Sequence, residues 1–321
     1  MSGFSGFESD DLDMSLAMEL GINARQSNSE LAKKLGVGET TIRRRLQRLL
    51  ETRAIAIAAI PSPQALGFQT RVLLGIKTDS GKSDDVAKCL ADIDCVRAVV
   101  QTAGSLDILV SAFFRTPQEF LDFIADDLSG IPNLTIAEKM FIIKLPKNTW
   151  QYINDKDNTG QETGPIHLDD IELRMIRELE ANPRESVINL SRKLGINRNL
   201  AGRKLQRLLD DRVVSIISIT GPVVFGFEIE AAIFVTTFPG TTSEVVETLI
   251  AKQRVAQLAL ITGCYDIFFW AGFCNIEELS EFLRKELGDI PGIMTHEIMI
   301  KLALPKRPWF RSTTHASLNL T

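Results

Sequence analysis

The stretch Leu31-Ala-Lys-Lys-Leu-Gly36 occurs a second time in this chain as Leu190-Ser-Arg-Lys-Leu-Gly195. The stretch Leu46-Gln-Arg-Leu-Leu50 returns in the same way, as Leu205-Gln-Arg-Leu-Leu209. The separation is 159 positions in both cases, from 36 to 195 and from 46 to 205. It also relates Gly67 to Gly226, Pro132 to Pro291 and Trp150 to Trp309. A separation that holds over the whole unit predicts two intact copies of one fold rather than a solenoid of small repeats.

The length and composition are typical of a globular protein with at least two domains. The chain has 321 residues, of which 45% are hydrophobic and 24% charged. No run approaches the roughly 18 apolar residues that a membrane helix needs. The first residues also lack the basic and apolar regions of a secretory signal. We therefore expect a cytoplasmic protein without a membrane partner.

The charged residues, cysteines and histidines disfavour several classes of function. A net charge of −5 disfavours a non-specific nucleic-acid coat, but it leaves DNA binding open because the placement of positive charge decides phosphate contacts. The four cysteines contain no Cys-x-x-Cys pair, and the three histidines are scattered. These features predict free thiols, no metal, no cofactor and no catalytic centre.

Each copy begins with a pattern of three short helices. Ser27 and Glu30 have the spacing of a capping box, and the helix that they start meets Gly36, a residue suited to a left-handed end. A third helix is expected at about 39–52, and at about 198–211 in the second copy. Its apolar face in the first copy comprises Ile42, Leu46, Leu49 and Leu50. Two short helices around a tight glycine turn, the second one basic, are typical of a helix-turn-helix.

The third helix is the expected DNA-binding element, because its exposed face is rich in arginine. On an isolated helix such a run is usually a solvated face, but here it recurs in the same place in a trihelical unit. The first turn of a recognition helix meets base edges, which gives the candidates Glu39, Thr40, Thr41, Arg43, Arg198, Asn199 and Arg203. Contacts to phosphates are expected from Arg44, Arg45, Arg48, Lys204 and Arg207. Since the two first turns differ in sequence, we expect an operator with two unlike half-sites.

After the third helix the pattern changes to that of an α+β domain. The β-branched runs at 54–60 and 213–219 predict a connecting strand. The segments that follow predict the order βαββαβ, a ferredoxin-like sandwich with helices on one face of its sheet. The other sheet face, if apolar, needs a partner. Two such domains in one chain can supply that partner to each other.

These patterns divide the chain into five segments. The fold class is α+β, with two copies of a winged or tri-helical helix-turn-helix, each followed by a ferredoxin-like domain. The segment 151–168 is polar and is expected to be a linker. The helix-turn-helix domains are expected at 1–60 and 169–219, and the ferredoxin-like domains at 61–150 and 220–321.

The motifs of each copy resemble those of the Lrp/AsnC (feast/famine) transcription regulators. The family's Asn-x-Arg after the first helix stands here as Asn23-Ala-Arg25 and Asn182-Pro-Arg184, and its Leu-Gly before the sensor domain as Leu66-Gly67. Its Thr-Gly-x-Tyr-Asp loop appears whole as Thr262-Gly-Cys-Tyr-Asp266. The first copy departs from this loop with Thr102-Ala-Gly-Ser-Leu-Asp107. The resemblance covers nearly the whole chain, twice, and implies that the βαββαβ unit is a ligand-sensing (RAM, ACT-like) domain.

The resemblance implies a sequence-specific DNA-binding transcription regulator that responds to a small molecule, an amino acid or a related metabolite, and that is not an enzyme. Its implied partners are double-stranded DNA and this effector, in a homo-oligomer or an intramolecular pseudo-dimer. In the family the loop helps to bind the effector between paired sensor domains. The implied effector-binding residues are Thr262, Gly263, Tyr265 and Asp266, and in the other copy Gly104, Ser105 and Asp107. A purely structural role for Gly263 and Asp266 in a tight hairpin stays open.

Two other functions also stay open. Some proteins with this plan are decarboxylases that act on a modified tetrapyrrole of the siroheme type. The dispersed histidines and the two tyrosines, Tyr152 and Tyr265, form no constellation for such chemistry. A ligand-binding protein that has lost its DNA contact would be compatible with Glu39 and with the acidic net charge.

Overall fold

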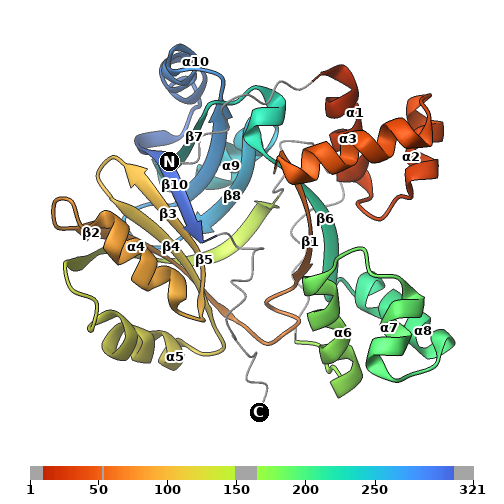
Figure 1. The fold of residues 1–321 in the computed structure, drawn as a ribbon. Coiled ribbons are helices and arrows are strands. Elements are labelled where there is room, and N and C mark those ends of the chain that lie inside the picture. Colours follow the sequence, from red (N-terminus) through yellow and green to blue (C-terminus); the bar gives the residue numbers. More distant parts are fainter. Residues whose placement is uncertain (1–9, 53, 149–164, 307–321) are drawn as a thin grey trace.

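The computed structural model describes residues 10–52, 54–148 and 165–306, and its two halves repeat one order of elements (Figure 1). The first half contains α1 (Asp11–Ile22), α2 (Asn28–Leu35), α3 (Glu39–Glu51), β1 (Ile55–Pro61), β2 (Thr70–Thr78), α4 (Ser83–Asp92), β3 (Val96–Ala103), β4 (Ile108–Phe114), α5 (Pro117–Asp122), the π-helical turn η1 (Phe123–Leu128) and β5 (Leu134–Asn148). The second half contains α6 (Asp170–Ala181), α7 (Val187–Leu194), α8 (Arg198–Asp210), β6 (Val214–Thr220), the 3₁₀ turn η2 (Pro222–Phe225), β7 (Ile229–Thr237), α9 (Thr242–Ile250), β8 (Val255–Ile261), β9 (Ile267–Phe273), α10 (Ile276–Glu281), the π-helical turn η3 (Phe282–Leu287) and β10 (Ile293–Lys306). The predicted linker at 151–168 lies mostly outside the described residues. None of the described helices is long and apolar enough to cross a membrane.

The helix-turn-helix domains have the local signals that the sequence predicts. Ser27 and Glu30 form a capping box at the start of α2, in which Glu30 N donates to Ser27 Oγ (3.2 Å) and Ser27 N donates to the Glu30 carboxylate (2.7 Å). Gly36 and Gly195 end α2 and α7 with φ of 67° and 68°, a conformation that a side chain would strain. Leu50 lies outside the apolar face expected for α3, since the residue is 39% exposed.

The connecting strands of the two halves pair with each other. Strands β1 and β6 form an antiparallel ribbon in which Ala58 pairs with Ile217, its own counterpart in the other copy. The ribbon therefore has an approximate two-fold axis at this pair. Helix α1 packs on β6, and α6 packs on β1. Val224 joins the core of the first helix-turn-helix domain, and Leu66 joins that of the second. Each of these cores thus contains residues from both halves.

The two ferredoxin-like domains close into one eight-stranded barrel (Figure 1). The sheets β3-β4-β2-β5 and β8-β9-β7-β10 are joined edge to edge by the β5–β8 and β10–β3 pairs. Helices pack on the outer face of each sheet, and the inner faces share an apolar cluster. Leu73 and Met140 enter this cluster from the first half, and Phe234 and Met299 from the second. The chain therefore supplies the partner that each apolar sheet face needs.

A lysine from each half binds the end of a helix in the other half. Lys147 of β5 donates from Nζ to the carbonyl oxygens of Ile250 and Lys252 at the end of α9, 3.0 Å away in each case. Lys306, its counterpart in β10, donates to the carbonyl oxygen of Ile93 after α4 (2.7 Å). These contacts are favourable because the last carbonyls of a helix carry a partial negative charge. Burial lowers the pKa of Lys147 to about 8.

This lowered pKa predicts that the stability of the fold depends on pH above neutrality. The folded chain loses the Lys147 proton near pH 8, whereas an unfolded lysine loses it near pH 10. Since Lys147 then binds more protons in the unfolded state between these values, this residue should contribute a rise of the free energy of unfolding with pH in that range. Urea denaturation at about pH 7 and about pH 9.5 measures this contribution as the difference between the wild-type chain and Lys147→Met, because the other groups with altered pKa values, Lys306 and Cys95 among them, are common to both chains. Lys144→Met, which removes an exposed lysine from the same strand, should retain it, and an unchanged rise in Lys147→Met would contradict the prediction.

Candidate nucleic-acid interface

The first turns of α3 and α8 are open to solvent. Helix α8 is capped by Asn197, whose Oδ1 accepts from Leu200 N (2.8 Å), whereas Gly38 caps α3 without a side-chain bond. Thr41 is half-buried. The other expected base-reading residues are exposed, namely Glu39, Thr40, Arg43, Arg198, Asn199 and Arg203. The expected reading turns thus lie on accessible surface.

Arg44 and Arg203 occupy the same position in the two copies, and both side chains are exposed. Neither has a hydrogen bond or ion pair with another side chain in the described part of the chain. Arg43, by comparison, lies 3.7 Å from a Glu39 carboxylate oxygen and is still 69% exposed. Although Arg44 was expected on phosphates and Arg203 on base edges, the repeat gives them equivalent positions. Their guanidinium groups are available to the same kind of partner.

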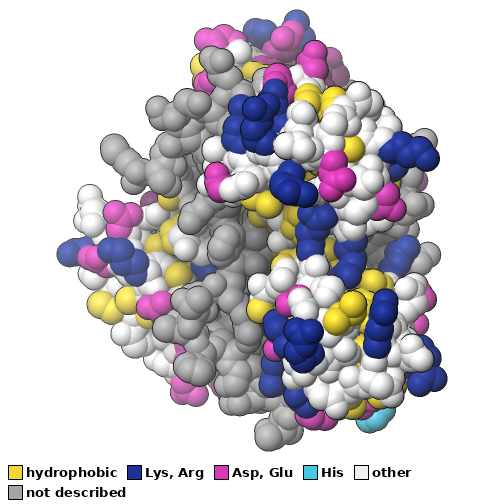
Figure 2. Space-filling model, turned by 45° about the vertical axis from the view of Figure 1, so that its right-hand side comes forward, with side chains coloured by type: hydrophobic (Ala, Val, Ile, Leu, Met, Phe, Trp, Pro, Cys, Tyr) yellow, Lys and Arg dark blue, Asp and Glu magenta, His cyan; other side chains and the backbone are white. Residues whose placement is uncertain are grey.

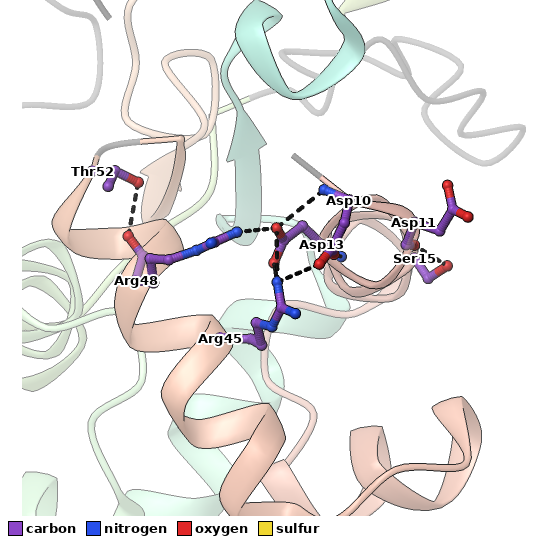
Figure 3. A network of polar contacts seen from close by, with 7 residues as sticks. All are labelled: Asp10, Asp11, Asp13, Ser15, Arg45, Arg48 and Thr52. Carbon is purple, nitrogen blue, oxygen red and sulfur yellow. Dashed lines mark hydrogen bonds and ion pairs between the residues drawn. The ribbon is translucent and has the colours of Figure 1, made fainter. Parts of the chain in front are cut away.

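Arg45 and Arg48 point toward the start of α1 (Figure 3). Arg45 Nη1 lies 2.6 Å from Asp10 Oδ2 and 3.3 Å from Asp13 Oδ2, and Arg48 pairs with the same Asp13 carboxylate. Asp13 is fully buried, and it also accepts from Asp10 N (3.3 Å) in the capping box of α1. Because a buried carboxylate is costly without partners, these arginines hold α3 against α1.

The second domain repeats this network with two substitutions, of which one is Glu172 in the place of Asp13. Lys204 stands in the place of Arg45, where it pairs with Asp169 and lies 3.5 Å from Glu172 Oε1. Arg207 Nη1 lies 2.8 Å from the same Glu172 oxygen, and Glu172 is buried. The hydrogen bond from Lys204 lowers the pKa of Asp169. The network is thus a feature of the repeated unit rather than of one copy.

Four residues expected on phosphates therefore have partners inside their own domains, namely Arg45, Arg48, Lys204 and Arg207. Arg45 and Lys204 are only 21% and 14% exposed. Arg48 and Arg207 are 43% and 47% exposed, so part of each guanidinium still faces outward. The sequence does contain a signal for these pairs. In both copies an acidic residue precedes the arginine by 35 positions, Asp13 for Arg48 and Glu172 for Arg207.

The two helix-turn-helix domains share a basic face. Lys and Arg side chains gather over both domains and at the junction between them, with acidic side chains scattered among them (Figure 2). This distribution reconciles the net charge of −5 with an anionic partner, because local rather than total charge decides phosphate binding. The face extends over both domains, as binding of one duplex by both third helices requires.

The two expected ligand loops lie where the sheets of the two halves join. Thr262 N donates to the carbonyl oxygen of Phe141 (3.0 Å), and Phe141 N donates to Thr262 Oγ1 (3.2 Å). On the other side of the barrel, Gly104 lies so close to β10 that an added Cβ would be 2.8 Å from the carbonyl oxygen of Ile298. Gly263 has a positive φ of 116°. These contacts give both glycines a structural reason to be present.

The loop carboxylates have partners within their own domains. The Asp266 carboxylate accepts from Thr237 N (2.7 Å) and Thr237 Oγ1 (3.1 Å), and that of Asp107 accepts from Thr78 N (2.7 Å). Tyr265 and Leu106 also occupy equivalent positions of the repeat, but their contacts differ more than those of the two carboxylates do. The hydroxyl of Tyr265 donates to the Glu297 carboxylate, whereas Leu106 is buried. Burial is the main cause of a raised pKa of Tyr265. Ser105 is exposed, as are Gly104, Thr262 and Gly263.

Family models match the domains of both copies. The AsnC-type helix-turn-helix domain matches residues 10–50, and a winged helix-turn-helix DNA-binding domain matches 168–215. The Lrp/AsnC ligand binding domain matches twice, at 71–151 and at 230–308.

Curated relatives have about the length of one copy. A chain of Pyrococcus furiosus, described as an uncharacterized HTH-type transcriptional regulator, is 30% identical over 140 residues, which are 43% of this chain and 95% of its own length. A similarly described regulator of Pyrococcus horikoshii is 28% identical over 142 residues, 44% of this chain and 90% of its own. Among solved structures, the siroheme decarboxylase NirDL aligns with 92% of both chains at a TM-score of 0.59 and 14% identity. That likeness shows a shared fold alone.

Proposed function

The chain belongs to the Lrp/AsnC family of transcription regulators, and from that premise we propose that it binds one DNA duplex with both of its third helices. The observation that carries the proposal is the pair Arg44 and Arg203. Both are exposed at the same position of the repeated unit, while four other basic residues of these two helices are paired with buried acids. A DNA-binding protein must share a compartment with the DNA, and this requirement agrees with the cytoplasmic location that the sequence predicts.

In this proposal the four internally paired basic residues position the recognition helices. Arg45 and Lys204 anchor α3 and α8 to the preceding first helices, and Arg48 and Arg207 can turn their exposed edges to a phosphate. Base edges are read by the first turns. These contain Glu39-Thr40-Thr41 in one copy and Arg198-Asn199-Leu200 in the other, so the two half-sites differ. Footprinting that reveals a perfect palindrome would count against unlike half-sites.

A gel shift with the upstream region of the chain's own gene tests the DNA-binding function. Each phosphate contact releases counterions, so the logarithm of affinity should fall by about 0.9 per contact for each tenfold rise in salt. We expect a specific complex with a steep salt dependence. A ligand-binding protein without DNA contact would give no shift, or a weak shift that is the same on unrelated DNA.

The loop of the second copy is better suited to effector binding than the loop of the first copy. Tyr265 offers a hydroxyl beside Glu297, and Thr262 and Gly263 offer an exposed turn, whereas Leu106 fills the equivalent place in the first copy. Asp266 and Asp107 act mainly as hairpin residues, because their carboxylates already accept hydrogen bonds from Thr237 and Thr78. We therefore propose that an amino acid or related metabolite binds at the loop with Tyr265.

Calorimetry with each of the twenty L-amino acids tests this effector site. We expect one binding event per chain, and we expect Tyr265→Phe to weaken it about tenfold, the usual effect of losing a hydrogen bond to a charged group. Ser105→Ala, in the loop of the other copy, serves as the control and should leave the affinity unchanged. Equal binding at two sites per chain, or an unaffected Tyr265→Phe variant, would contradict the assignment.

The enzyme hypothesis rests on fold likeness to a siroheme decarboxylase, and many functions share a fold. The family membership and the exposed arginines on α3 and α8 favour regulation over catalysis. Conversion of an iron tetrapyrrole by the purified chain, followed by its absorption spectrum, would support the enzyme instead.

A further inference from the structure

The two helix-turn-helix domains touch each other through the turns that follow α1 and α6. Arg25 donates from Nη1 to the carbonyl oxygen of Pro183 (3.4 Å) and from Nη2 to that of Glu185 (3.3 Å). Arg184 donates from Nη2 to the carbonyl oxygen of Gln26 (2.6 Å). Arg25 and Arg184 are counterparts, 159 positions apart. Each domain thus gives one arginine to the backbone of the other, and we call this contact the arginine junction.

The acceptor carbonyls of the arginine junction belong to well-anchored residues. Gln26 is buried, and its Nε2 donates to the carbonyl oxygens of Glu19 (2.6 Å) and Asn23 (3.2 Å). Glu185 is also buried, and its carboxylate accepts from Asn189 Nδ2 (2.9 Å) and pairs with Lys193 (2.9 Å). A displacement of one domain relative to the other would therefore break charge-assisted hydrogen bonds rather than move a loose loop.

The charges at the arginine junction also favour a defined geometry. Both arginines are half-buried, and burial lowers the pKa of each guanidinium, with the charge of Arg184 adding to the effect on Arg25. No carboxylate pairs with either arginine in the described part of the chain. Two like charges stay in proximity here because each donates to oriented carbonyl dipoles of the opposite domain.

The arginine junction and the β1–β6 ribbon together hold the domains at two places. Helix α1 packs on β6 and α6 packs on β1, so the ribbon fixes one side of each domain (Figure 1). The arginine junction fixes the turns beyond these helices. We propose that Arg25 and Arg184 set the distance between α3 and α8, so that the chain selects operators with one half-site spacing. This inference rests on the proposed DNA binding, in which half-site spacing mirrors the geometry of paired recognition helices.

The test replaces both arginines by methionine, which keeps the apolar stem and removes the donors. An operator selected from random DNA by the wild-type chain is lengthened or shortened between its half-sites in steps of one base pair. The wild-type chain should bind its preferred spacing about 30-fold or more tighter than a spacing changed by two base pairs, because only one spacing fits a preorganised pair of helices. Arg25→Met with Arg184→Met should reduce this ratio to about threefold or less, while the affinity for a single half-site stays the same. A wild-type chain without spacing preference, or a variant that keeps it, would overturn the inference.

A distance measurement separates failure of this inference from failure of the DNA-binding function. Spin labels at Glu51→Cys and Asp210→Cys, exposed counterparts at the ends of α3 and α8, are introduced after the four natural cysteines are replaced by serine. The parent chain should give a narrow distance distribution, and the Arg25→Met, Arg184→Met chain a broad one. Lys33→Met with Arg192→Met, exposed counterparts on α2 and α7, removes the same charge and should leave the distribution narrow. An equally narrow distribution without the two arginines would overturn the inference whether or not the chain binds DNA.

Discussion

Replacing Arg44 and Arg203 together by alanine is expected to weaken operator binding about 100-fold, which is about 1.4 kcal/mol for each arginine. Both side chains are exposed on the third helices and have no internal partner among the described side chains, so their loss removes contacts to DNA without leaving a buried group unpaired. If both contact phosphates, the plot of the logarithm of affinity against the logarithm of salt concentration should also become less steep, by about 1.8 in slope. Fluorescence anisotropy at several salt concentrations measures both effects.

A matched control separates this effect from the change in net charge. Lys88→Ala with Arg284→Ala removes two exposed positive charges from the sensor domains, far from the third helices along the fold. This control should bind DNA nearly as the wild-type chain does. If the control and the Arg44, Arg203 variant lost the same affinity, the two arginines would act through overall charge rather than through contact.

Replacing Asp13 by asparagine and Glu172 by glutamine is expected to destabilise the helix-turn-helix domains, by about 3 kcal/mol for each substitution. Each acid is buried and binds two basic side chains from the third helix of its domain. The neutral substitutes keep the shape but lose the charge, which leaves partly buried cations without their partner. Urea denaturation followed by circular dichroism measures the change in the free energy of unfolding.

The exposed neighbours of these acids provide the control. Asp11 and Asp170 lie in the first turns of α1 and α6 and are exposed, and Figure 3 shows Asp11 pointing away from the network. Asp11→Asn with Asp170→Asn should change stability by less than about 1 kcal/mol, the scale of exposed charge effects near a helix N-terminus. A stability loss as large as that of the buried pair would contradict a special role for Asp13 and Glu172.

Much of the fold was predictable because local signals and the repeat agree. Capping residues, glycine turns and apolar periodicity gave the helices, and the constant separation showed that each element occurs twice. The pairing of apolar sheet faces within the chain also followed from the duplication. The pairing of β1 with β6 did not, because strand pairing across such a distance in sequence has no local signal.

The sequence predicts which helices form the candidate interface, but it predicts the contacts of only some of their residues. Helical periodicity places Arg44 opposite the buried face of α3 and Arg45 on the flank of that face, but it does not reveal that Arg45 pairs with Asp10 and Asp13. The distinguishing partners lie on another helix, and only their recurrence in the second copy marks them. The sequence does not mark Arg25 and Arg184 as contact residues for the same reason, since their partners lie in the opposite domain.

Footprinting of one operator with three chains tests most directly whether both third helices act on the same duplex. The wild-type chain, Arg44→Ala and Arg203→Ala are compared with hydroxyl radicals at saturating protein concentration. The wild-type chain should protect two half-sites about one or more whole helical turns apart. Arg44→Ala should lose protection in one half-site, and Arg203→Ala in the other. A single protected segment with the wild-type chain, or the same pattern with all three chains, would contradict the account.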